Sequence, residues 1–457
     1  MSSKVNQENQ NQSSGQISLG QEHVCVLGLG YVGLTLAVTL AELRVRVTGV
    51  DRNPQVLESL KSGKSHFYEK GLDGVLKKYL GDTFSVAQSI DAAEDFNVFI
   101  ISAGTPIKAD GTPNLSFVEE CAKEIGKHLR PESLVILRST VPVGTTRNVV
   151  LPVLEKISGL KCGLDFSLVF APERTVEGNA LRELRELPQI IGGIDEKSFI
   201  RASNLFRKTT PTIIKVSSLE SAEMVKIMDN TYRDLNFAIA NELSLICEKL
   251  SLNAVEVIKA ANMGYNRTNI PLPSPGVGGA CLSKDPYILL DVSRNAGYEA
   301  RFVEIGRKIN EFMPVNAANR VKSFFQKNPK KNPKIFVLGF AFKAKPLTSD
   351  VRNSPTETLI KELKPLSTEI YGFDPAVEPS VLVSTFGVKP CSIEQGFENA
   401  DCVVIMLNHE MYADQDIFSL LQKTQKPTLF YDGWQQFKPG DIHQIPGIVH
   451  EGVGFIG

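Results

Sequence analysis

The fold is set by Val24-Cys25-Val26-Leu27-Gly28-Leu29-Gly30-Tyr31-Val32-Gly33, in which an apolar run meets a turn with three glycines. The run is typical of a β-strand, and the glycines have the G-x-G-x-x-G spacing of turns that bind a dinucleotide. A helix-like run follows over residues 34–43, and a second apolar run over 45–50 ends at Asp51, 18 residues after Gly33. Together these segments predict a βαβ unit that binds a dinucleotide.

Each glycine of this turn has its own task in the prediction. Gly28 makes the turn, Gly30 admits the pyrophosphate, and Gly33 allows the helix to pack on the strand. The helix N-terminus that follows favours negative charge. Tyr31 and Val32, within the same turn, are also expected to contact the cofactor.

Asp51 closes the second strand of the unit and bears on the choice of cofactor. A carboxylate at this place hydrogen-bonds the ribose hydroxyls and repels a 2′-phosphate, which favours NAD over NADP. The neighbouring Arg52 is a further candidate contact and leaves NADP as the alternative.

Strand-like runs continue to alternate with helical stretches through about residue 210. They lie at residues 98–102, 134–138 and 168–171. This alternation predicts a doubly wound parallel sheet for the first part of the chain.

A second alternating set begins near residue 335. Its strand-like runs lie at 335–340, 370–374, 402–407 and 429–432. This half lacks the glycine triplet, because Gly339-Phe340-Ala341-Phe342-Lys343 puts bulky residues where a pyrophosphate requires close approach of the backbone. We therefore expect the two halves to bind different ligands.

A long helical stretch over residues 218–250 lies between the halves, and Ser217-Ser218-Leu219-Glu220 at its start has the spacing of a capping box. Such a helix extends to roughly 50 Å, more than a small domain needs. The predicted fold class is α/β, with two Rossmann-like doubly wound parallel-sheet domains joined by a long central helix in an all-α region. We expect that region to form a homodimer interface.

The composition excludes several classes of protein. Lys and Arg (50) nearly balance Asp and Glu (51), so no global field favours nucleic acid or an anionic membrane. The seven cysteines have no C-x-x-C spacing, which indicates a reduced, cytoplasmic protein, and the six histidines form no cluster, so we predict no metal. Residues 1–20 are expected to be a disordered tail, and the longest apolar run, 34–43, is too short to span a bilayer.

A lone cysteine stands in the segment Pro275-Gly276-Val277-Gly278-Gly279-Ala280-Cys281-Leu282-Ser283-Lys284-Asp285. Glycines let backbone N–H groups approach a ligand, and an adjacent cation or carboxylate can tune the thiol. Cys281 is therefore a candidate nucleophile for a carbonyl carbon. A small buried hydrophobic residue is the alternative for a free cysteine.

Lys226 and Asn230 are four residues apart on the long helix and so share a face. Together they can donate to a developing oxyanion. The alternative is a pair of solvated side chains on a helix surface.

Further candidates lie where strands end. Thr105-Pro106 and Thr140 follow two strands and Glu173 closes a third, and ligands bind at the carboxyl ends of parallel strands. Ordinary turn chemistry is the alternative for the two turns, and a cap is the alternative for Glu173.

In the second half, Lys343 and Arg352 precede Ser354-Pro355-Thr356-Glu357, which is typical of a capped helix start. This end of the second sheet is a plausible phosphate or sugar site. A surface loop is the alternative.

Taken together, four motifs resemble those of the UDP-glucose/GDP-mannose dehydrogenase family, over about residues 22–455. They are the glycine-rich segment at 275–285, the E-x-x-K-x-x-x-N pattern at 223–230, the Ser-Thr-Val-Pro-Val-Gly-Thr-Thr turn at 139–146, and the block from Ala341-Phe342-Lys343 to Ser354-Pro355. The resemblance implies an NAD-binding Rossmann domain (21–210), a central helical dimerisation region carrying the catalytic cysteine (211–325) and a C-terminal nucleotide-sugar-binding domain (326–457).

The resemblance also implies a four-electron oxidation. The C6 alcohol of a nucleotide sugar is oxidised to an aldehyde, Cys281 captures the aldehyde as a thiohemiacetal, and a second oxidation gives a thioester that water hydrolyses. Lys226 and Asn230 stabilise the oxygen anion. Glu173 and Asp285 position or deprotonate water, helped by Thr140, and two NAD⁺ are consumed.

Binding residues follow from the same resemblance. Beyond the glycine turn, cofactor contacts are implied for Tyr31, Val32, Asp51, Arg52, Thr105, Pro106, Thr140, Lys284 and Arg352. Contacts to the sugar nucleotide are implied for Glu173, Arg174, Lys226, Asn230, Arg267, Gly276, Gly278, Gly279, Phe342 and Lys343, with Arg352 reaching across from the second half.

The order Ala171-Pro172-Glu173-Arg174 resembles the UDP-N-acetylhexosamine branch of the family. UDP-N-acetyl-mannosamine is the expected substrate, with UDP-N-acetyl-glucosamine and UDP-glucose as alternatives. A two-electron hydroxyacid-type dehydrogenase and a non-catalytic nucleotide-sugar-binding protein are more distant alternatives.

Overall fold

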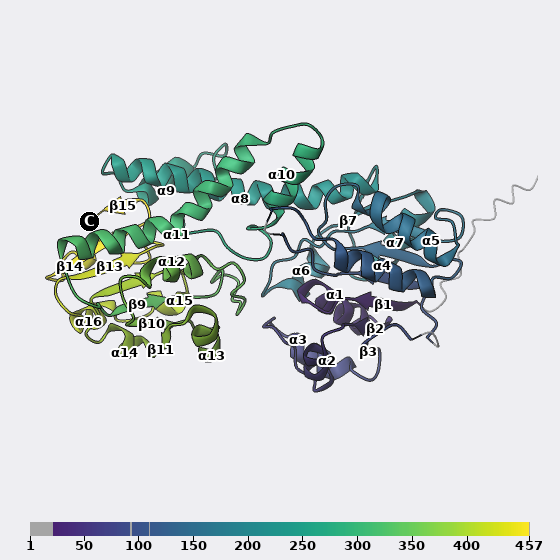
Figure 1. Ribbon diagram of the computed structural model, residues 1–457, viewed down its shortest axis with the longest axis horizontal. Helices are drawn as coiled ribbons and strands as arrows, with labels where there is room; N and C mark the ends of the chain where they lie inside the picture. The colour runs from purple at the N-terminus through teal and green to yellow at the C-terminus, as the bar shows by residue number, and fades with distance from the viewer. Residues whose placement is uncertain (1–21, 92–93, 109, 457) are drawn as a thin grey trace, which may run out of the picture.

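The computed structural model describes residues 22–91, 94–108 and 110–456 (Figure 1). The tail predicted over residues 1–20 lies outside the described residues. The described chain forms two sheets, drawn at opposite ends of Figure 1, with long helices running between them. Two α/β halves joined by a helical region are the predicted fold class, which is confirmed.

The first sheet has eight strands among the described residues, in the order β3-β2-β1-β4-β5-β6-β7-β8. Its strands are β1 (His23–Leu27), β2 (Arg46–Val50), β3 (Phe84–Ala87), β4 (Val98–Ile101), β5 (Leu134–Leu137), β6 (Ser167–Phe170), β7 (Gln189–Gly193) and β8 (Ile213–Val216). The first six run parallel, whereas β7 pairs antiparallel with β6. The sheet is therefore mixed at one end, where the sequence predicted only parallel strands.

Helices cover both faces of the first sheet, and they are α1 (Tyr31–Glu42), α2 (Pro54–Lys61), α3 (Leu72–Tyr79), α4 (Ser116–His128), α5 (Leu151–Ser158), α6 (Ala180–Glu186), α7 (Glu196–Phe206) and the π-helical turn η1 (Thr146–Val150). Strand β1 is buried along its whole length, as a central parallel strand must be. The sheet order reverses between β1 and β4, so a crevice opens at the carboxyl ends of these two strands.

The second sheet has seven strands within the described chain, in the order β11-β10-β9-β12-β13-β14-β15. They are β9 (Ile335–Leu338), β10 (Ile370–Phe373), β11 (Lys389–Pro390), β12 (Cys402–Ile405), β13 (Thr428–Asp432), β14 (Ile448–Gly452) and β15 (Phe455–Ile456). The last strand pairs antiparallel with β14. Its helices are α12 (Pro355–Leu363), α13 (Pro379–Val381), α14 (Ile393–Phe397), α15 (Glu410–Ala413), α16 (Ile417–Gln422), α17 (Pro439–Ile442) and the turn η2 (Leu382–Phe386).

The first turn of each sheet is closed by an aspartate that accepts a backbone hydrogen bond, but the two turns differ in the size of their residues. Asp51 accepts from the backbone N–H of Leu29 at 2.8 Å, and Asp374 accepts from that of Phe340 at 2.6 Å. Phe340 is fully buried, so its ring packs in the core behind the second turn. This bulky residue in the second turn agrees with the prediction that the turn does not bind a pyrophosphate.

Between the sheets lie α8 (Leu219–Lys249), α9 (Ala254–Asn262), α10 (Asp285–Asn295) and α11 (Arg301–Lys327). Helix α8 has the length predicted from the sequence and packs along α11 (Figure 1). A Cβ on Gly192 of β7 would lie 2.2 Å from the carbonyl oxygen of Ser218, so the glycine allows α8 to start against the first sheet. No helix in the described ranges combines the length and hydrophobicity needed to cross a membrane.

The predicted capping box at the start of α8 is wrong by one residue. The helix begins at Leu219, so its cap is Ser218, whose side chain accepts from the N–H of Ser221 at 3.1 Å. Glu220 instead pairs with Arg147 at 2.6 Å. The predicted helix start at residue 354 is confirmed, because Ser354 accepts from the N–H of Thr356 and Pro355 opens α12.

Candidate active site

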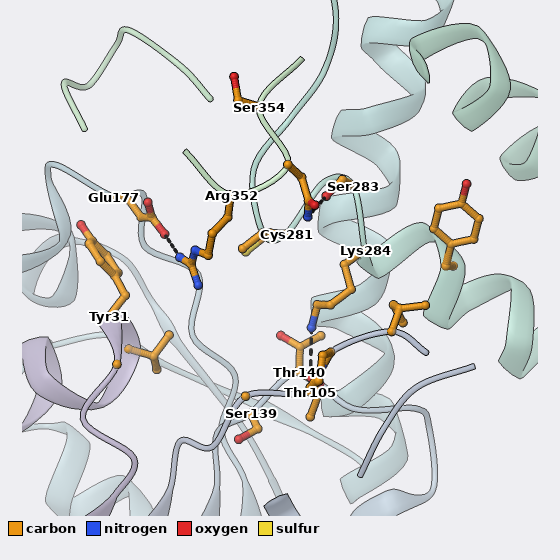
Figure 2. Close-up of a pocket in the computed structure, with 18 of the residues that line it drawn as sticks. Tyr31, Thr105, Ser139, Thr140, Glu177, Cys281, Ser283, Lys284, Arg352 and Ser354 are labelled. Carbon is orange, nitrogen blue, oxygen red and sulfur yellow. Dashed lines mark hydrogen bonds and ion pairs between the residues drawn. The ribbon is translucent and has the colours of Figure 1, made fainter. Parts of the chain in front are cut away.

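A cavity of 1170 Å³ lies at the carboxyl ends of β1 and β4, with α8, α10 and the second half around it. Predicted residues that line it are Gly28, Gly30, Tyr31, Val32, Asp51, Thr105, Pro106, Thr140, Glu173, Lys226, Cys281, Lys284 and Arg352. Figure 2 shows Cys281 beside Arg352 of the second half, and Lys284 pointing towards Thr105 of the first half. The structure thus brings together Gly28 and Arg352, which are 324 residues apart in the sequence.

The glycine turn leaves room for a ligand where the prediction requires it. Gly28 has a φ of +91°, in the left-handed region that glycine tolerates. A Cβ on Gly33 would lie 1.9 Å from the carbonyl oxygen of Gly28, so only glycine lets α1 sit against the turn. A Cβ on Gly30 meets no described atom within 4 Å and would project into the space that a pyrophosphate needs.

Asp51 and Arg52 have different surroundings. The Asp51 carboxylate borders the cavity and accepts from the N–H groups of Leu29 at 2.8 Å and Asn53 at 2.9 Å. Arg52 instead lies on the outer surface, paired with Glu120 and over a phenylalanine ring. The structure therefore supports the Asp51 part of the cofactor prediction and does not bring Arg52 into the cavity.

Two predicted turns meet at Thr105. Its hydroxyl donates to the carbonyl oxygen of Thr140 at 2.5 Å and accepts from Nζ of Lys284 at 2.9 Å (Figure 2). Lys284 also pairs with Asp285 at 3.3 Å. This chain of contacts joins the first sheet to the segment that carries Cys281.

The cysteine loop, residues 274–282, presents Cys281 to the cavity immediately before α10. The carbonyl oxygen of Cys281 accepts from the N–H groups of Lys284 at 3.0 Å and Asp285 at 2.8 Å, which fixes the turn. The thiol is exposed at the cavity wall. Enclosure raises the pKa of Cys281, Asp285 raises it further, and Lys226 and Lys284 lower it.

Lys226 and Asn230 project from one face of α8 towards the cysteine loop. Asn230 donates through Nδ2 to Asp285 at 2.5 Å, and Asp285 is fully buried. The second oxygen of Asp285, Oδ1, has no hydrogen-bond partner in the described structure. Lys226 is buried, and its ammonium makes no hydrogen bond or ion pair with any described residue. A buried, unpaired cation beside a thiol is a group free to act on a ligand.

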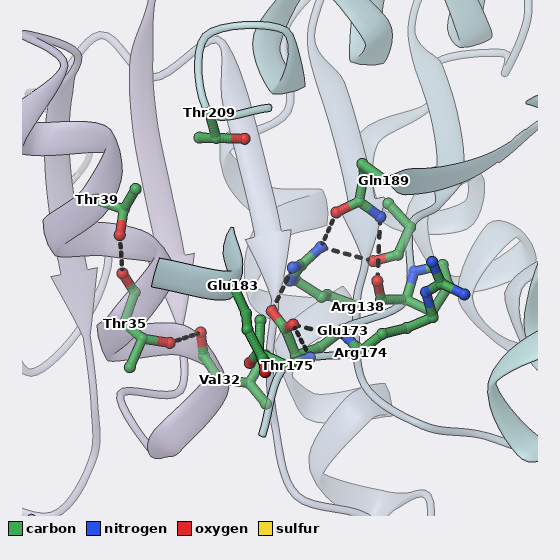
Figure 3. A network of polar contacts seen from close by, with 12 residues as sticks. Val32, Thr35, Thr39, Arg138, Glu173, Arg174, Thr175, Glu183, Gln189 and Thr209 are labelled. Carbon is green, nitrogen blue, oxygen red and sulfur yellow. Dashed lines mark hydrogen bonds and ion pairs between the residues drawn. The ribbon is translucent and has the colours of Figure 1, made fainter. Parts of the chain in front are cut away.

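Glu173 is held at the end of β6 by several donors. Arg138 pairs with one oxygen, and the N–H groups of Arg174 and Thr175 donate to the other at 2.7 and 2.8 Å (Figure 3). Burial alone raises the pKa of Glu173, but Arg138 and the Thr175 amide outweigh it, so the pKa lies below its usual value. Glu173 is thus a fixed anion whose lone pairs are largely engaged, which makes it a poor proton acceptor.

Arg138 is a functional candidate that sequence reasoning missed. It follows β5, is buried, and donates to Gln189 and to the carbonyl oxygen of Ala171, each at 3.0 Å. A charged residue directly after a fully apolar strand is the signal that could have identified it.

The predicted sugar-contacting glycines instead support packing of the cysteine loop on the second half. A Cβ on Gly276 would lie 2.5 Å from Pro355, and one on Gly278 would lie 2.4 Å from the carbonyl oxygen of Asn353. A Cβ on Gly279 would lie 2.6 Å from the ring of Phe342. Gly276, Gly278, Gly279 and Phe342 thus form the joint between loop and second half, while Val277 and Ala280 line the cavity.

Five other predicted residues do not line the cavity: Asn230 and Asp285 are buried outside its lining, and Arg174, Arg267 and Lys343 have partners elsewhere. Arg174 pairs with Asp229 at 3.3 Å, and Arg267 is exposed with its guanidinium over the Tyr265 ring. Lys343 donates to the backbone carbonyl of Glu177 at 2.6 Å, and burial lowers the pKa of Lys343 to about 8.

Glu177 is a second group that the sequence did not single out. It lines the cavity, and burial together with Asp350 raises its pKa to about 7. Arg352 from the second half pairs with Asp350 at 2.5 Å and with Glu177 at 3.4 Å (Figure 2). The two halves therefore meet across a charged contact at the cavity. No group of three metal-binding side chains occurs in the described ranges.

Comparison with known proteins identifies this architecture. The chain matches three models of the UDP-glucose/GDP-mannose dehydrogenase family: the NAD binding domain over residues 22–210, the central domain over 220–312 and the UDP binding domain over 336–439.

Individual relatives agree with these matches. A UDP-N-acetyl-D-mannosamine dehydrogenase from Pyrococcus horikoshii is 35% identical over 94% of this chain and 99% of its own. A solved structure of UDP-D-ManNAc dehydrogenase from the same organism has a TM-score of 0.86 at 34% identity, covering 94% of this chain and 99% of that one. A UDP-glucose dehydrogenase from Pyrobaculum islandicum has a TM-score of 0.84 at 27% identity, covering 96% and 99%.

Proposed function

This chain belongs to the UDP-glucose/GDP-mannose dehydrogenase family of NAD-dependent nucleotide-sugar dehydrogenases, and we propose that it oxidises the C6 alcohol of UDP-N-acetyl-D-mannosamine to the uronic acid. The sugar is proposed because a 35% identical relative over nearly the whole chain carries that name. UDP-N-acetyl-glucosamine and UDP-glucose are the competing substrates.

One observation carries the proposal. The thiol of Cys281 faces the cavity that the glycine turn opens into, close enough to the unpaired ammonium of Lys226 for that charge to lower the thiol pKa. A nucleophile, an oxyanion donor and a dinucleotide turn in one cavity are the groups that a thiol-dependent second oxidation requires.

Bound NAD⁺ supplies a hydride acceptor, used twice for each sugar. Between the two oxidations, the sulfur of Cys281 adds to the aldehyde carbon and the carbonyl oxygen takes up a proton, which gives a thiohemiacetal. Loss of a hydride and a proton from this group gives a thioester. Water then attacks the thioester carbon, the C–S bond breaks, and the uronate leaves while the thiol is restored.

Lys226 and Asn230 are assigned to the oxygen that becomes negative during these steps. Each donor of this kind is worth about 3 kcal/mol of transition-state stabilisation in other enzymes. Lys226 has no competing partner within the described structure, and Asn230 uses one side-chain N–H on Asp285, which leaves the other for the ligand.

The water that cleaves the thioester requires a base, and Asp285 suits this role better than Glu173. Oδ1 of Asp285 accepts no hydrogen bond from the described residues and lies 3.3 Å from the Lys284 ammonium, whereas Glu173 is occupied by Arg138 and two backbone amides. We therefore assign the base to Asp285. Glu173 keeps the turn that it caps in place and places negative charge near Lys226, and Thr140 is assigned to hold the water.

The cofactor is assigned to the first half and the sugar nucleotide to the space between the halves. Gly28, Gly30, Tyr31, Val32 and Asp51 would hold NAD, because they form the open turn at the sheet edge. The UDP-sugar is assigned to the wall formed by the cysteine loop and the second half, which matches a UDP binding domain.

The exposed side of the helical region suggests how the chain assembles. It carries large exposed apolar side chains, among them Met228, Tyr232, Ile246, Met263, Phe302 and Ile305. An apolar surface of this kind is typical of a protein interface, so we propose a homodimer built on α8. Light scattering is expected to give twice the 50.2 kDa of one chain, and a 50.2 kDa particle would contradict the proposal.

The compartment follows from the cysteines. All seven are free in the described structure, including the nucleophile. A reducing compartment preserves such thiols, so we propose the cytoplasm.

A panel of UDP- and GDP-sugars incubated with NAD⁺ tests the proposed function. UDP-N-acetyl-D-mannosamine is expected to give the fastest rise in NADH absorbance. A faster rise with UDP-N-acetyl-glucosamine or UDP-glucose would replace the proposed sugar, and no rise with any sugar would contradict the proposed function.

A further inference from the structure

A cluster of polar residues is buried between α8 and α11, behind the cysteine loop. Asp234 and Asn241 on α8 are fully buried, and Arg307 and Asn310 on α11 are 3% and 1% exposed. None of the four belongs to the chemistry assigned above. Polar groups at such depth require partners, and these form one network.

The network has an ion pair at its centre. Arg307 donates from Nη1 to Oδ1 of Asp234 at 2.6 Å. Asn310 donates to the same oxygen and to the carbonyl oxygen of Asp234, both at 2.9 Å, and Asn241 donates to Oδ1 of Asn310 at 2.9 Å.

The network touches both ends of the cysteine loop. At the start of the loop, the N–H of Ser274 donates to Oδ1 of Asn241 at 2.8 Å. At its end, Nη1 of Arg307 donates to the carbonyl oxygen of Leu282, the residue after the nucleophile, at 3.3 Å. Between these anchors the loop contains three glycines, which by themselves leave the backbone free to adopt many conformations.

The ion pair is costly where it stands. Nε of Arg307 and Oδ2 of Asp234 have no hydrogen-bond partner in the part of the chain that the structure describes. Burying two charges with unsatisfied atoms often stabilises a fold less than apolar side chains of the same volume would. Stability alone is therefore a weak explanation of the pair, and its contact with the cysteine loop offers another.

We propose that Arg307, held by Asp234, is a positioning residue that fixes the cysteine loop so that the Cys281 sulfur meets the aldehyde. This inference rests on the proposed function and adds a residue to its machinery. Arg307 reaches the cavity wall but acts through the backbone of Leu282 and not on the sugar.

The two half-reactions separate this role from a general structural one. Oxidation of the 6-aldehyde with NAD⁺ requires the thiol, whereas reduction of the same aldehyde to the alcohol with NADH does not. A shift of about 1 Å in a reacting group costs about 100-fold in rate. Arg307→Met is therefore expected to slow aldehyde oxidation about 100-fold and to leave aldehyde reduction within about threefold of wild type.

Conservative variants grade the effect. Arg307→Lys keeps a cation opposite Asp234, but its single nitrogen cannot also replace Nη2, which donates to Glu311 at 3.2 Å. This variant is therefore expected to oxidise the aldehyde about tenfold more slowly than wild type, the value of one hydrogen bond. If Arg307→Met does not fold, Arg307→Lys and Asp234→Asn are compared in its place, with the same ratio of the two half-reactions as the readout.

Arg320 provides a matched control on the same two helices. It lies on α11 and pairs with Glu248 of α8, as Arg307 pairs with Asp234, but it contacts no residue of the cysteine loop. Arg320→Met removes a comparable ion pair, so it is expected to change stability and to leave the ratio of the two half-reactions unaltered.

Three outcomes decide the matter, with the 6-aldehyde of the sugar that gives NADH as the probe. Selective loss of oxidation in Arg307→Met supports the positioning role. Equal loss of both half-reactions, or loss of neither, overturns it. Cys281→Ala is run in parallel: if that variant still oxidises the aldehyde, the proposed function fails and not only the inference about Arg307.

Discussion

The side-chain amide of Asn230 donates to the carboxylate of Asp285 at 2.5 Å, and Asp285 is fully buried. This contact joins the long helix α8 to the start of α10, immediately after the cysteine loop. Asn230, four positions from Lys226, therefore orients the carboxylate. The contact between α8 and the start of α10 thus holds the proposed base, the oxyanion donor and the nucleophile relative to one another.

Lys226→Met separates catalysis from stability. Because the ammonium is buried and unpaired among the described residues, its replacement by a side chain of similar length is expected to leave the melting temperature unchanged or higher. Loss of an oxyanion donor is expected to lower kcat by about 100-fold or more. Thermal unfolding and NADH production measure the two effects, and a lower melting temperature with normal kcat would contradict the assignment.

The glycine turn gives opposite predictions for neighbouring positions. Gly30→Ala meets no described atom within 4 Å and is expected to raise KM for NAD⁺ without loss of stability. Gly33→Ala places a Cβ 1.9 Å from a backbone oxygen and is expected to lower the free energy of unfolding by about 1–3 kcal/mol or more. NAD⁺ titration and urea unfolding of both variants check this pair. If the two variants changed KM for NAD⁺ and the free energy of unfolding to the same extent, the assignment of the glycine turn to the pyrophosphate would be contradicted.

The titration of Cys281 is expected to move in opposite directions in two variants. Enclosure by the surrounding protein and Asp285 raise the thiol pKa, and Lys226 lowers it. Lys226→Met removes a charge that favours the thiolate, so the pH at which Cys281 becomes reactive should rise. Asp285→Asn removes a charge that disfavours it, so that pH should fall. The rate of iodoacetamide alkylation at Cys281, followed across pH by peptide mapping, measures both shifts, and a common direction would refute the arrangement.

Gly279→Ala tests the joint between the cysteine loop and the second half. The residue has a φ of +92°, and a Cβ would lie 2.6 Å from the Phe342 ring. The loop must move, so we expect kcat to fall while NAD⁺ affinity stays within about twofold of wild type. Gly297→Ala is the control, because Gly297 also has positive φ (+78°) but nothing described within 4 Å. Equal losses in the two variants would mean that backbone strain alone is responsible.

Local patterns were sufficient to predict the central parallel strands of both sheets and the long helix, whereas β3, β7, β8, β11 and β14 were missed. The apolar runs that became β1, β4 and β5 are buried along their whole length, so their composition alone identifies them. Strand β8 is half exposed and β11 has two residues, and such short edge strands carry little pattern. Strand β7 was not predicted, and its direction could not have been, because pairing direction depends on the connection and not on the strand itself.

Residues whose own side-chain chemistry suits the proposed reaction could be predicted from the sequence. Residues whose role depends on a partner far away in the sequence could not. Cys281 and Lys226 were identified from residue type and spacing, and both line the cavity. Arg138 and Arg307 were not identified, because their roles depend on Glu173 and Asp234, which lie 35 and 73 residues away in the sequence. The predicted contacts of Gly276, Gly278 and Gly279 with the sugar nucleotide stay a prediction, and the structure adds that all three pack closely against the second half, which the sequence did not indicate.

The number of NADH molecules formed per UDP-sugar consumed tests the central claim most directly, with Cys281→Ala measured beside the wild type. The account predicts two NADH and one uronate per sugar in the wild type, and near-complete loss of uronate in the variant. One NADH per sugar, with full activity in Cys281→Ala, would contradict it.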